Sequence, residues 1–144
     1  LIKYAVLASL SLSMSCLFRS LSVLLRYKIG PVDVQKFRNY ICDRLLEHFE
    51  YNIGDEKLKV WLEYCNLDEN NNLTPAGYVQ RMRNPGQWGG APEIAITSKY
   101  YNVIIKVSYN GRIVSKFDCG RTPTEELTLL YTGGHYEPGG IVNL

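Results

Sequence analysis

Apolar residues recur at helical spacing through the first two thirds of the chain. In residues 16–27 the expected buried face consists of Leu17, Leu21, Leu24 and Leu25. Asp33 is placed to cap a second helix. The buried stripe of that helix is expected to be Val34, Phe37, Ile41, Leu45 and Phe49. Its polar residues are expected in water: Gln35, Lys36, Arg38, Asp43, Arg44 and Glu47.

Three more helices are predicted before the pattern changes. Residues 55–65 form the first, with Asp55 and Glu56 at its positive end. A threonine cap followed by a first-turn proline predicts a short helix over 74–83. The third helix is expected over about 92–100.

β-Branched and aromatic residues dominate the last third of the chain. Residues 102–109 and 112–117 predict two strands, joined by the hairpin pair Asn110-Gly111. Residues 127–131 predict another strand. Helices followed by antiparallel strands indicate an α+β fold, in which helices pack around a small, mainly antiparallel sheet.

Composition narrows the classes of function. The 144 residues carry 16 basic and 14 acidic side chains, and the net charge of +2 is too mild to favour nucleic acid or a membrane as the main partner. No repeat or linker interrupts the chain, so residues 1–144 are expected to form one domain. The four cysteines include no Cys-x-x-Cys pair, which favours a cytoplasmic location and predicts no metal or other cofactor.

The N-terminal run is open to two interpretations. Residues 4–14 are apolar and follow a lysine, as in the hydrophobic segment of a secretory signal. The run is too short to span a bilayer as a helix, and Arg19 closes it, so a short buried element is the alternative. Because the sequence begins with Leu1 rather than methionine, we expect a fragment or one piece of a longer polyprotein, in which a signal here would be out of place.

A cysteine near the start of an amphipathic helix is the first candidate for chemistry. Unpaired amides and the helix dipole favour an anion there, so Cys16 is expected to act as a nucleophile. A cysteine nucleophile needs an imidazole, and His135 follows a glycine turn after a strand. Residues i and i+2 of a strand share one side, so Glu137 could orient His135 and complete a Cys–His–acid triad.

The remaining cysteines and the second histidine have structural interpretations. Cys42 and Cys65 lie on apolar helical stripes and are expected in the core. Cys119 lies in a polar turn with no base nearby in sequence. His48 has charged neighbours and is expected on a solvated helix face.

Three blocks of sequence resemble the OTU (ovarian tumour) family of cysteine proteases. Residues 14–22, MSCLFRSLS, are similar to the family's nucleophile segment, Asp-Gly-Asn-Cys-Leu-Phe-Arg-Ala. Tyr78, Met82 and residues 87–90, Gln-Trp-Gly-Gly, are similar to its Tyr…Met…Trp-Gly-Gly block. Residues 135–137, His-Tyr-Glu, are similar to its His-Tyr-Asp or His-Tyr-Asn. The blocks occur in family order and extend over nearly the whole chain.

The resemblance implies a papain-like domain that cleaves after the C-terminal glycine of ubiquitin or a ubiquitin-like modifier, through a thioester intermediate. Cys16 would be the nucleophile, His135 the general base and acid, and Glu137 the orienting acid. The oxyanion hole would be formed by backbone amides of Cys16 and the loop before it: Ser13, Met14 and Ser15. The implied partner is ubiquitin or polyubiquitin, and the protein is expected to be a monomer.

Five further positions in the resembling blocks have expected roles. Trp88, Gly89 and Gly90 can form a narrow channel for a Gly-Gly tail, or can simply pack a turn. Tyr136 points opposite to His135 on a strand and is expected mainly to pack. Glu93 is expected to compensate a helix dipole.

Departures from the family pattern leave alternatives open. Ser13 and Met14 stand where the family has Asp and Gly, and a positive φ at Met14 would strain the loop by about 1–3 kcal/mol. Glu137 is one methylene longer than the family's acid, with Asn143 as a conceivable substitute. Besides an active isopeptidase, the alternatives are a degenerate OTU domain that binds ubiquitin without cleaving it, and a secreted or lipid-anchored protein with Cys16 as its processed terminus. A compact domain without an initial methionine would also suit a viral polyprotein protease.

Overall fold

The computed structural model describes residues 14–53, 55–64, 74–118 and 120–144. Its helices are α2 (Cys16–Leu24), α3 (Arg26–Ile29), α4 (Val34–Glu47), α5 (Leu58–Tyr64), α6 (Pro75–Met82) and α7 (Ala91–Tyr101). Its strands are β1 (Asn52–Ile53), β2 (Glu56–Lys57), β3 (Val103–Tyr109), β4 (Arg112–Phe117), β5 (Glu125–Tyr131) and β6 (Tyr136–Asn143). The α+β class is confirmed, since these helices precede a four-stranded sheet.

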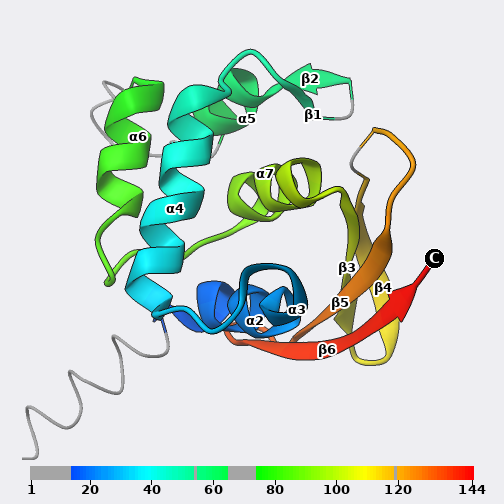
Figure 1. Cartoon of the computed structure of the whole chain (residues 1–144). Helices are drawn as coiled ribbons and strands as arrows, with labels where there is room; N and C mark the ends of the chain where they lie inside the picture. Colours follow the sequence, from blue (N-terminus) through cyan, green and yellow to red (C-terminus); the bar gives the residue numbers. More distant parts are fainter. Residues whose placement is uncertain (1–13, 54, 65–73, 119) are drawn as a thin grey trace, which may run out of the picture.

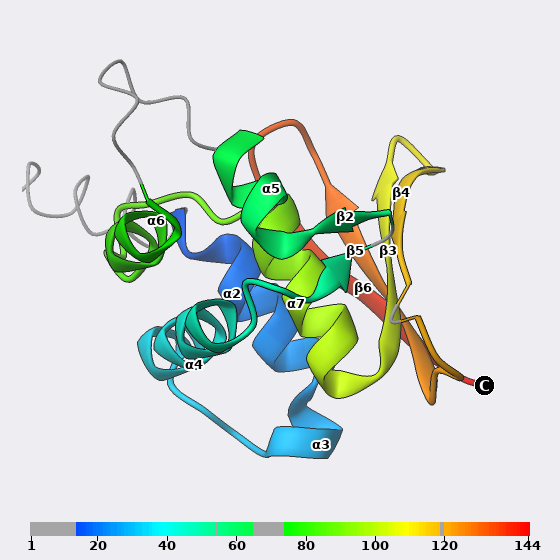
Figure 2. The same ribbon diagram turned by 90° about the horizontal axis from the view of Figure 1, so that it is seen from above.

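Helix α7 lies at the centre of the fold, between α4 and the sheet (Figure 1; Figure 2). It contacts α4 on one side and β3 and β4 on the other. Because both sides are covered, its residues from Pro92 to Ser98 are buried without a break. Helix α2 lies against α4 and β6, so the first described helix and the last strand of the chain meet.

The four-stranded sheet is mixed, in the order β4-β3-β5-β6. Strands β3 and β4 form the predicted hairpin, and Asn110 and Gly111 adopt the positive φ values, 50° and 76°, that favour a two-residue turn. Strand β5 pairs antiparallel with β6 but parallel with β3, a pairing that the hairpin signal did not indicate. Because β5 occupies the other edge of β3, β3 is a central strand, and it begins with three successive buried residues, Val103, Ile104 and Ile105.

Capping signals predicted two helix starts correctly. Thr74 Oγ1 accepts a hydrogen bond from the backbone N–H of Gly77 at 3.1 Å at the start of α6. Asp33 Oδ2 accepts one from the backbone N–H of Lys36, also at 3.1 Å, at the start of α4. These bonds satisfy amides that have no partner within the helix.

Two helix predictions were wrong in extent. The helix expected over 16–27 is divided between α2 and α3. The helix expected over 55–65 begins only at Leu58, because the residues before it form the small β1–β2 hairpin. Asp55 and Glu56 therefore precede the helix and do not lie in its first turn.

The environment of Arg38 was also predicted wrongly. Its side chain is not in water but completely buried, with 0% of its surface exposed. It lies on the same helical face as Phe37, Ile41 and Leu45, which are buried as expected. Cys42 is in the core as expected. Cys65, Cys119 and the N-terminal run up to residue 13 lie outside the described residues.

Candidate active site

Cys16 begins α2 and is almost fully buried, with 2% of its surface exposed. Its Sγ accepts a hydrogen bond from the backbone N–H of Tyr136, the first residue of β6, at 3.3 Å. The helix N-terminus and this amide both favour negative charge on the sulfur. Cys42 differs, because burial and the nearby Glu93 carboxylate raise the pKa of its thiol to about 12. The Cys16 sulfur thus accepts a hydrogen bond at a helix N-terminus, whereas the Cys42 thiol lies buried near a carboxylate.

The turn between β5 and β6 presents His135. Gly133 opens this turn with a φ of 83°, and the backbone N–H of Thr132 donates to the His135 carbonyl at 3.0 Å. His135 Nε2 lies 3.5 Å from Glu137 Oε1, and the two side chains are 46% and 57% exposed. With Nε2 facing the carboxylate, Nδ1 is the nitrogen available to accept a proton.

A cavity of about 430 Å³ brings together residues from the two ends of the described chain. Cys16, His135 and Glu137 all line it, together with other residues of α2 and β6. Within the described residues, the hydrogen bond to the Cys16 sulfur comes from the amide of Tyr136 and not from the imidazole. The cavity thus joins the three residues of the predicted triad, while the sulfur is bonded to the strand backbone.

Ser20, one helical turn after Cys16, connects α2 to β6. Its buried Oγ lies 2.7 Å from the Cys16 carbonyl oxygen and 3.1 Å from the Tyr136 carbonyl oxygen, so the hydroxyl bridges helix and strand. The ring of Tyr136 packs on Tyr131 at a centroid distance of 4.9 Å, as expected. Ser20 was not predicted as a site residue. The available signal was a polar residue at i+4 from Cys16 on a buried helix face.

The segment before Cys16 is held by Arg38 of α4. Its Nη2 donates to the Met14 carbonyl and to Ser15 Oγ, both at 3.2 Å. The guanidinium also stacks on the ring of Phe18, 4.2 Å from the centroid. Sequence reasoning missed this contact because it placed Arg38 in solvent.

Met14 does not carry the strain that a positive φ would cause. Its backbone is helical, and the described non-glycine residues with positive φ are Asn102 and Asn110. Ser15 follows it with a φ of −96°. Ser13 lies outside the described residues. The described part of the predicted oxyanion loop is therefore unstrained in this respect.

Gly89 packs against the helix that carries Cys16. A Cβ added at Gly89 would lie 2.8 Å from Leu17 Cδ2 and 2.9 Å from Phe18 Cε2, which leaves no room for a larger residue. A Cβ at Gly90 would meet nothing within 4 Å. Trp88 is 45% exposed. The packing interpretation therefore fits Gly89, while the substrate channel stays a prediction.

Glu93 is buried in the first turn of α7 and bonds to the Trp-Gly-Gly segment. Its Oε1 accepts from the backbone N–H of Gly90 at 2.8 Å, and its Oε2 accepts from the hydroxyl of Tyr78 at 2.7 Å. Burial raises the pKa of Glu93 to about 7, against the opposing effect of these two donors. The bond to Gly90 satisfies an amide at the helix N-terminus, in line with the role expected from sequence.

Asn143 lies too far from His135 to orient its ring. It pairs with Glu125 at the opposite end of the β5–β6 ladder. A strand rises about 3.3 Å per residue, so roughly 20 Å separates the two ends of β6. Glu137 is therefore the acid beside His135, and the substitute considered from sequence is excluded by position.

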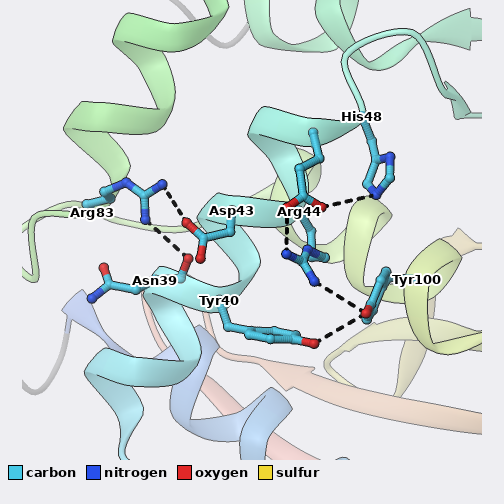
Figure 3. A network of polar contacts seen from close by, with 8 residues as sticks. Asn39, Tyr40, Asp43, Arg44, His48, Arg83 and Tyr100 are labelled. Atoms are coloured by element: carbon cyan, nitrogen blue, oxygen red, sulfur yellow. Dashed lines mark hydrogen bonds and ion pairs between the residues drawn. The ribbon is translucent and has the colours of Figure 1, made fainter.

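A polar network covers other faces of α4 (Figure 3). The Arg44 guanidinium lies beside the rings of Tyr40 and Tyr100, 4.7 and 5.1 Å from their centroids. Arg83, at the end of α6, donates to Asp43 Oδ1 at 2.7 Å. These contacts join α4 to α6 and α7 and do not line the cavity of Cys16.

His48 follows the last residue of α4 and belongs to this network. Its ring stacks on Tyr51 at 4.1 Å, and its Nε2 lies 3.8 Å from Glu47 Oε2, so it is partly buried rather than solvated. In the described ranges of the chain, no group of three or more His, Cys, Asp or Glu side chains could hold a metal ion. No helix among those ranges has the length and apolar character needed to cross a membrane.

Sequence comparison relates most of the chain to one family. A family model described as OTU-like cysteine protease matches residues 15–136. OTU domain-containing protein 2 of Saccharomyces cerevisiae is 29% identical over 139 residues, which cover 89% of this chain and 41% of that protein. Ubiquitin thioesterase Otu1 of Drosophila melanogaster is 29% identical over 127 residues, which cover 86% of this chain and 32% of that protein. The chain thus spans less than half the length of these relatives.

Comparison with solved structures supports the same fold. An OTU domain in complex with ubiquitin superposes with a TM-score of 0.61 at 21% identity, over 90% of this chain and 69% of that chain. The Hazara virus OTU bound to ubiquitin gives a TM-score of 0.57 at 17% identity, over 92% of this chain and 78% of that chain.

Proposed function

Because the chain belongs to the OTU-like cysteine protease family, we propose that it is a thiol isopeptidase acting after the C-terminal glycine of ubiquitin or a ubiquitin-like modifier. The observation that carries this proposal is the shared cavity of Cys16, His135 and Glu137, with Glu137 facing Nε2 of the imidazole. Ubiquitin as the partner is supported by two structures of the same fold that contain it.

Acylation begins with transfer of the Cys16 thiol proton to Nδ1 of His135. The thiolate attacks the carbonyl carbon of the terminal glycine, and the carbonyl electron pair moves to oxygen. Backbone amides at Ser15 and Cys16 would stabilise this oxyanion. When the tetrahedral intermediate collapses, the leaving amine takes the proton from the imidazolium, and a thioester to Cys16 remains.

In deacylation, water is the nucleophile and His135 again acts first as a base and then as an acid. His135 accepts a proton from water, and the hydroxide attacks the thioester carbonyl. The thiolate leaves and recovers a proton from the imidazolium, which releases the modifier as a free carboxylic acid that then loses its proton to water. Glu137 stabilises the imidazolium through both steps and keeps Nε2 protonated.

The test is covalent labelling by ubiquitin that carries a C-terminal electrophile. Wild type should gain the mass of one ubiquitin, and Cys16→Ala should gain none. Cys42→Ala is the matched control, because this second buried thiol lies outside the cavity, and labelling should persist. Unlabelled folded wild type, or labelling that survives Cys16→Ala, would contradict the proposal.

A second candidate function is ubiquitin binding without cleavage. It is favoured by the burial of Cys16 and by the bond of its sulfur to a backbone amide. Saturable binding of ubiquitin with no hydrolysis of any chain linkage would support this candidate. Hydrolysis that depends on Cys16 would eliminate it.

A further inference from the structure

Arg38 connects two segments that both lead into the proposed site. Its Nη1 donates to the carbonyls of Met82 and Gln87, both at 2.9 Å, and its Nη2 donates to Met14 O and Ser15 Oγ, both at 3.2 Å. One segment immediately precedes the nucleophile, and the other immediately precedes the Trp-Gly-Gly segment. A single side chain therefore fixes the spacing between them.

The bonded partners of Arg38 are backbone carbonyls, a hydroxyl and a thioether, with no carboxylate among the described contacts. Burial lowers the pKa of Arg38, while Cys42 and Glu93 act in the opposite direction, and a guanidinium stays charged in either case. A buried charge is costly unless hydrogen bonds satisfy it. The hydrogen bonds of Arg38 go mainly to backbone carbonyls, so its guanidinium holds the backbone in place.

The geometry of the guanidinium determines how the loop before Cys16 is oriented. Its plane is rigid and is stacked on Phe18 of α2, so the two terminal nitrogens point in fixed directions. Nη2 binds the Met14 carbonyl, and in a planar trans peptide the N–H of Ser15 points the opposite way. Arg38 thus sets the direction of an amide that directly precedes the nucleophile.

We propose that Arg38 is a positioning residue of the proposed protease, which aligns the oxyanion-hole backbone before Cys16 with the segment that leads to Trp88. This role rests on the proposed function. It requires the planar, two-nitrogen shape of arginine, since a lysine ammonium is a compact point charge that cannot hold both segments in one geometry.

The test is steady-state hydrolysis of ubiquitin that carries a C-terminal fluorogenic amide, with wild type, Arg38→Lys and Arg83→Lys. We expect Arg38→Lys to lower kcat about 100-fold and to change KM less than about threefold, because the oxyanion donors act in the transition state. Arg83 is the matched control, because it donates to Asn39 O and Asp43 of the same helix but does not touch the Cys16 segment. Arg83→Lys should keep the wild-type kcat.

The outcomes separate this role from the proposed function. An inactive wild type overturns the proposed function and this role with it. An active wild type with unchanged kcat in Arg38→Lys overturns this role alone. The role is also overturned if both lysine variants lose kcat equally and the loss matches the fall in their folded fraction, measured by circular dichroism. If Arg38→Lys does not fold, Ser15→Ala takes its place: a lower kcat supports the role, and an unchanged kcat overturns it.

Discussion

Helix α4 carries two arginines whose charges are held in different ways. Arg38, on the inner face, is fully buried and donates mainly to backbone carbonyls. Arg44, on another face, lies beside two tyrosine rings and donates to Tyr100 Oη at 3.3 Å and Glu47 Oε1 at 2.8 Å. Side-chain partners can rotate away when the arginine is removed, whereas backbone carbonyls cannot. The inner face therefore organises the main chain of the site, and the other face only joins helices.

The same substitution at both arginines gives the largest expected difference. Arg38→Met should lower the free energy of unfolding by about 3–5 kcal/mol, because several buried carbonyls lose their donor at once. Arg44→Met should cost about 1 kcal/mol, as is usual for surface ion pairs and cation–π contacts. Urea denaturation of both variants is the measurement. Equal losses would remove the distinction between the two faces.

The buried acid near Arg38 should make stability depend on pH. The pKa of Glu93 is about 7 in the folded state, against an ordinary value of 4.5, so the folded chain holds this proton more tightly than the unfolded chain. Its contribution is complete below about pH 4.5 and is lost as the pH rises through 7, a change of at most about 3 kcal/mol. Free energies of unfolding at pH 5 and pH 8 should differ less in Glu93→Gln than in wild type. An identical pH dependence in the variant would contradict this assignment.

Substitutions at two adjacent glycines test how tightly the segment after Trp88 packs against α2. Gly89→Ala should destabilise the protein by about 1–3 kcal/mol, because its Cβ would press on two fully buried side chains of α2, Leu17 and Phe18. Gly90→Ala has open space around its Cβ and should cost only about 0.5 kcal/mol, through the poorer helix cap. Thermal unfolding compares the two. Similar shifts in Tm would show that the contact at Gly89 relaxes easily.

Two serines of α2 give the smallest expected effect. Ser20→Ala should lower stability by about 1 kcal/mol and also slow labelling by the ubiquitin probe, because Ser20 bridges the Cys16 helix to β6. Ser22 also donates to a backbone carbonyl, that of Arg19 at 2.8 Å, but this bond stays within α2. Ser22→Ala should therefore leave labelling unchanged. Equal labelling rates in both variants would contradict a role for the bridge.

The features that were predicted correctly depend on residues that lie close together in the sequence. The Thr74 cap and the Asn110-Gly111 turn specify their structures within four residues, and both are present. The triad of Cys16, His135 and Glu137 was predicted from residue types and then supported by the family resemblance, because no local pattern connects a helix start to a turn 119 positions later. The parallel pairing of β3 with β5 escaped prediction because it depends on which edge of β3 is filled.

Arg38 and Ser20 were missed for a different reason. Both have the helical spacing of a buried face, since Arg38 lies four residues after Val34 and Ser20 lies four residues after Cys16. Their polarity was given more weight than their position. Such residues are buried when a distant backbone supplies their hydrogen-bond partners, and that information is not contained in the helix itself.

The backbone N–H of Tyr136, at the start of β6, donates a hydrogen bond to the Cys16 sulfur. A chemical change at this sulfur therefore affects how β6 is held against α2. A thioester sulfur accepts a hydrogen bond more weakly than a thiolate, and a sulfenic acid places an oxygen atom on the sulfur. Either change would alter the acceptor of the Tyr136 amide, while Ser20 still lies within hydrogen-bond distance of the carbonyl of the same residue. Amide hydrogen exchange at this one position would therefore report whether the Cys16 sulfur is unmodified or has been acylated or oxidised.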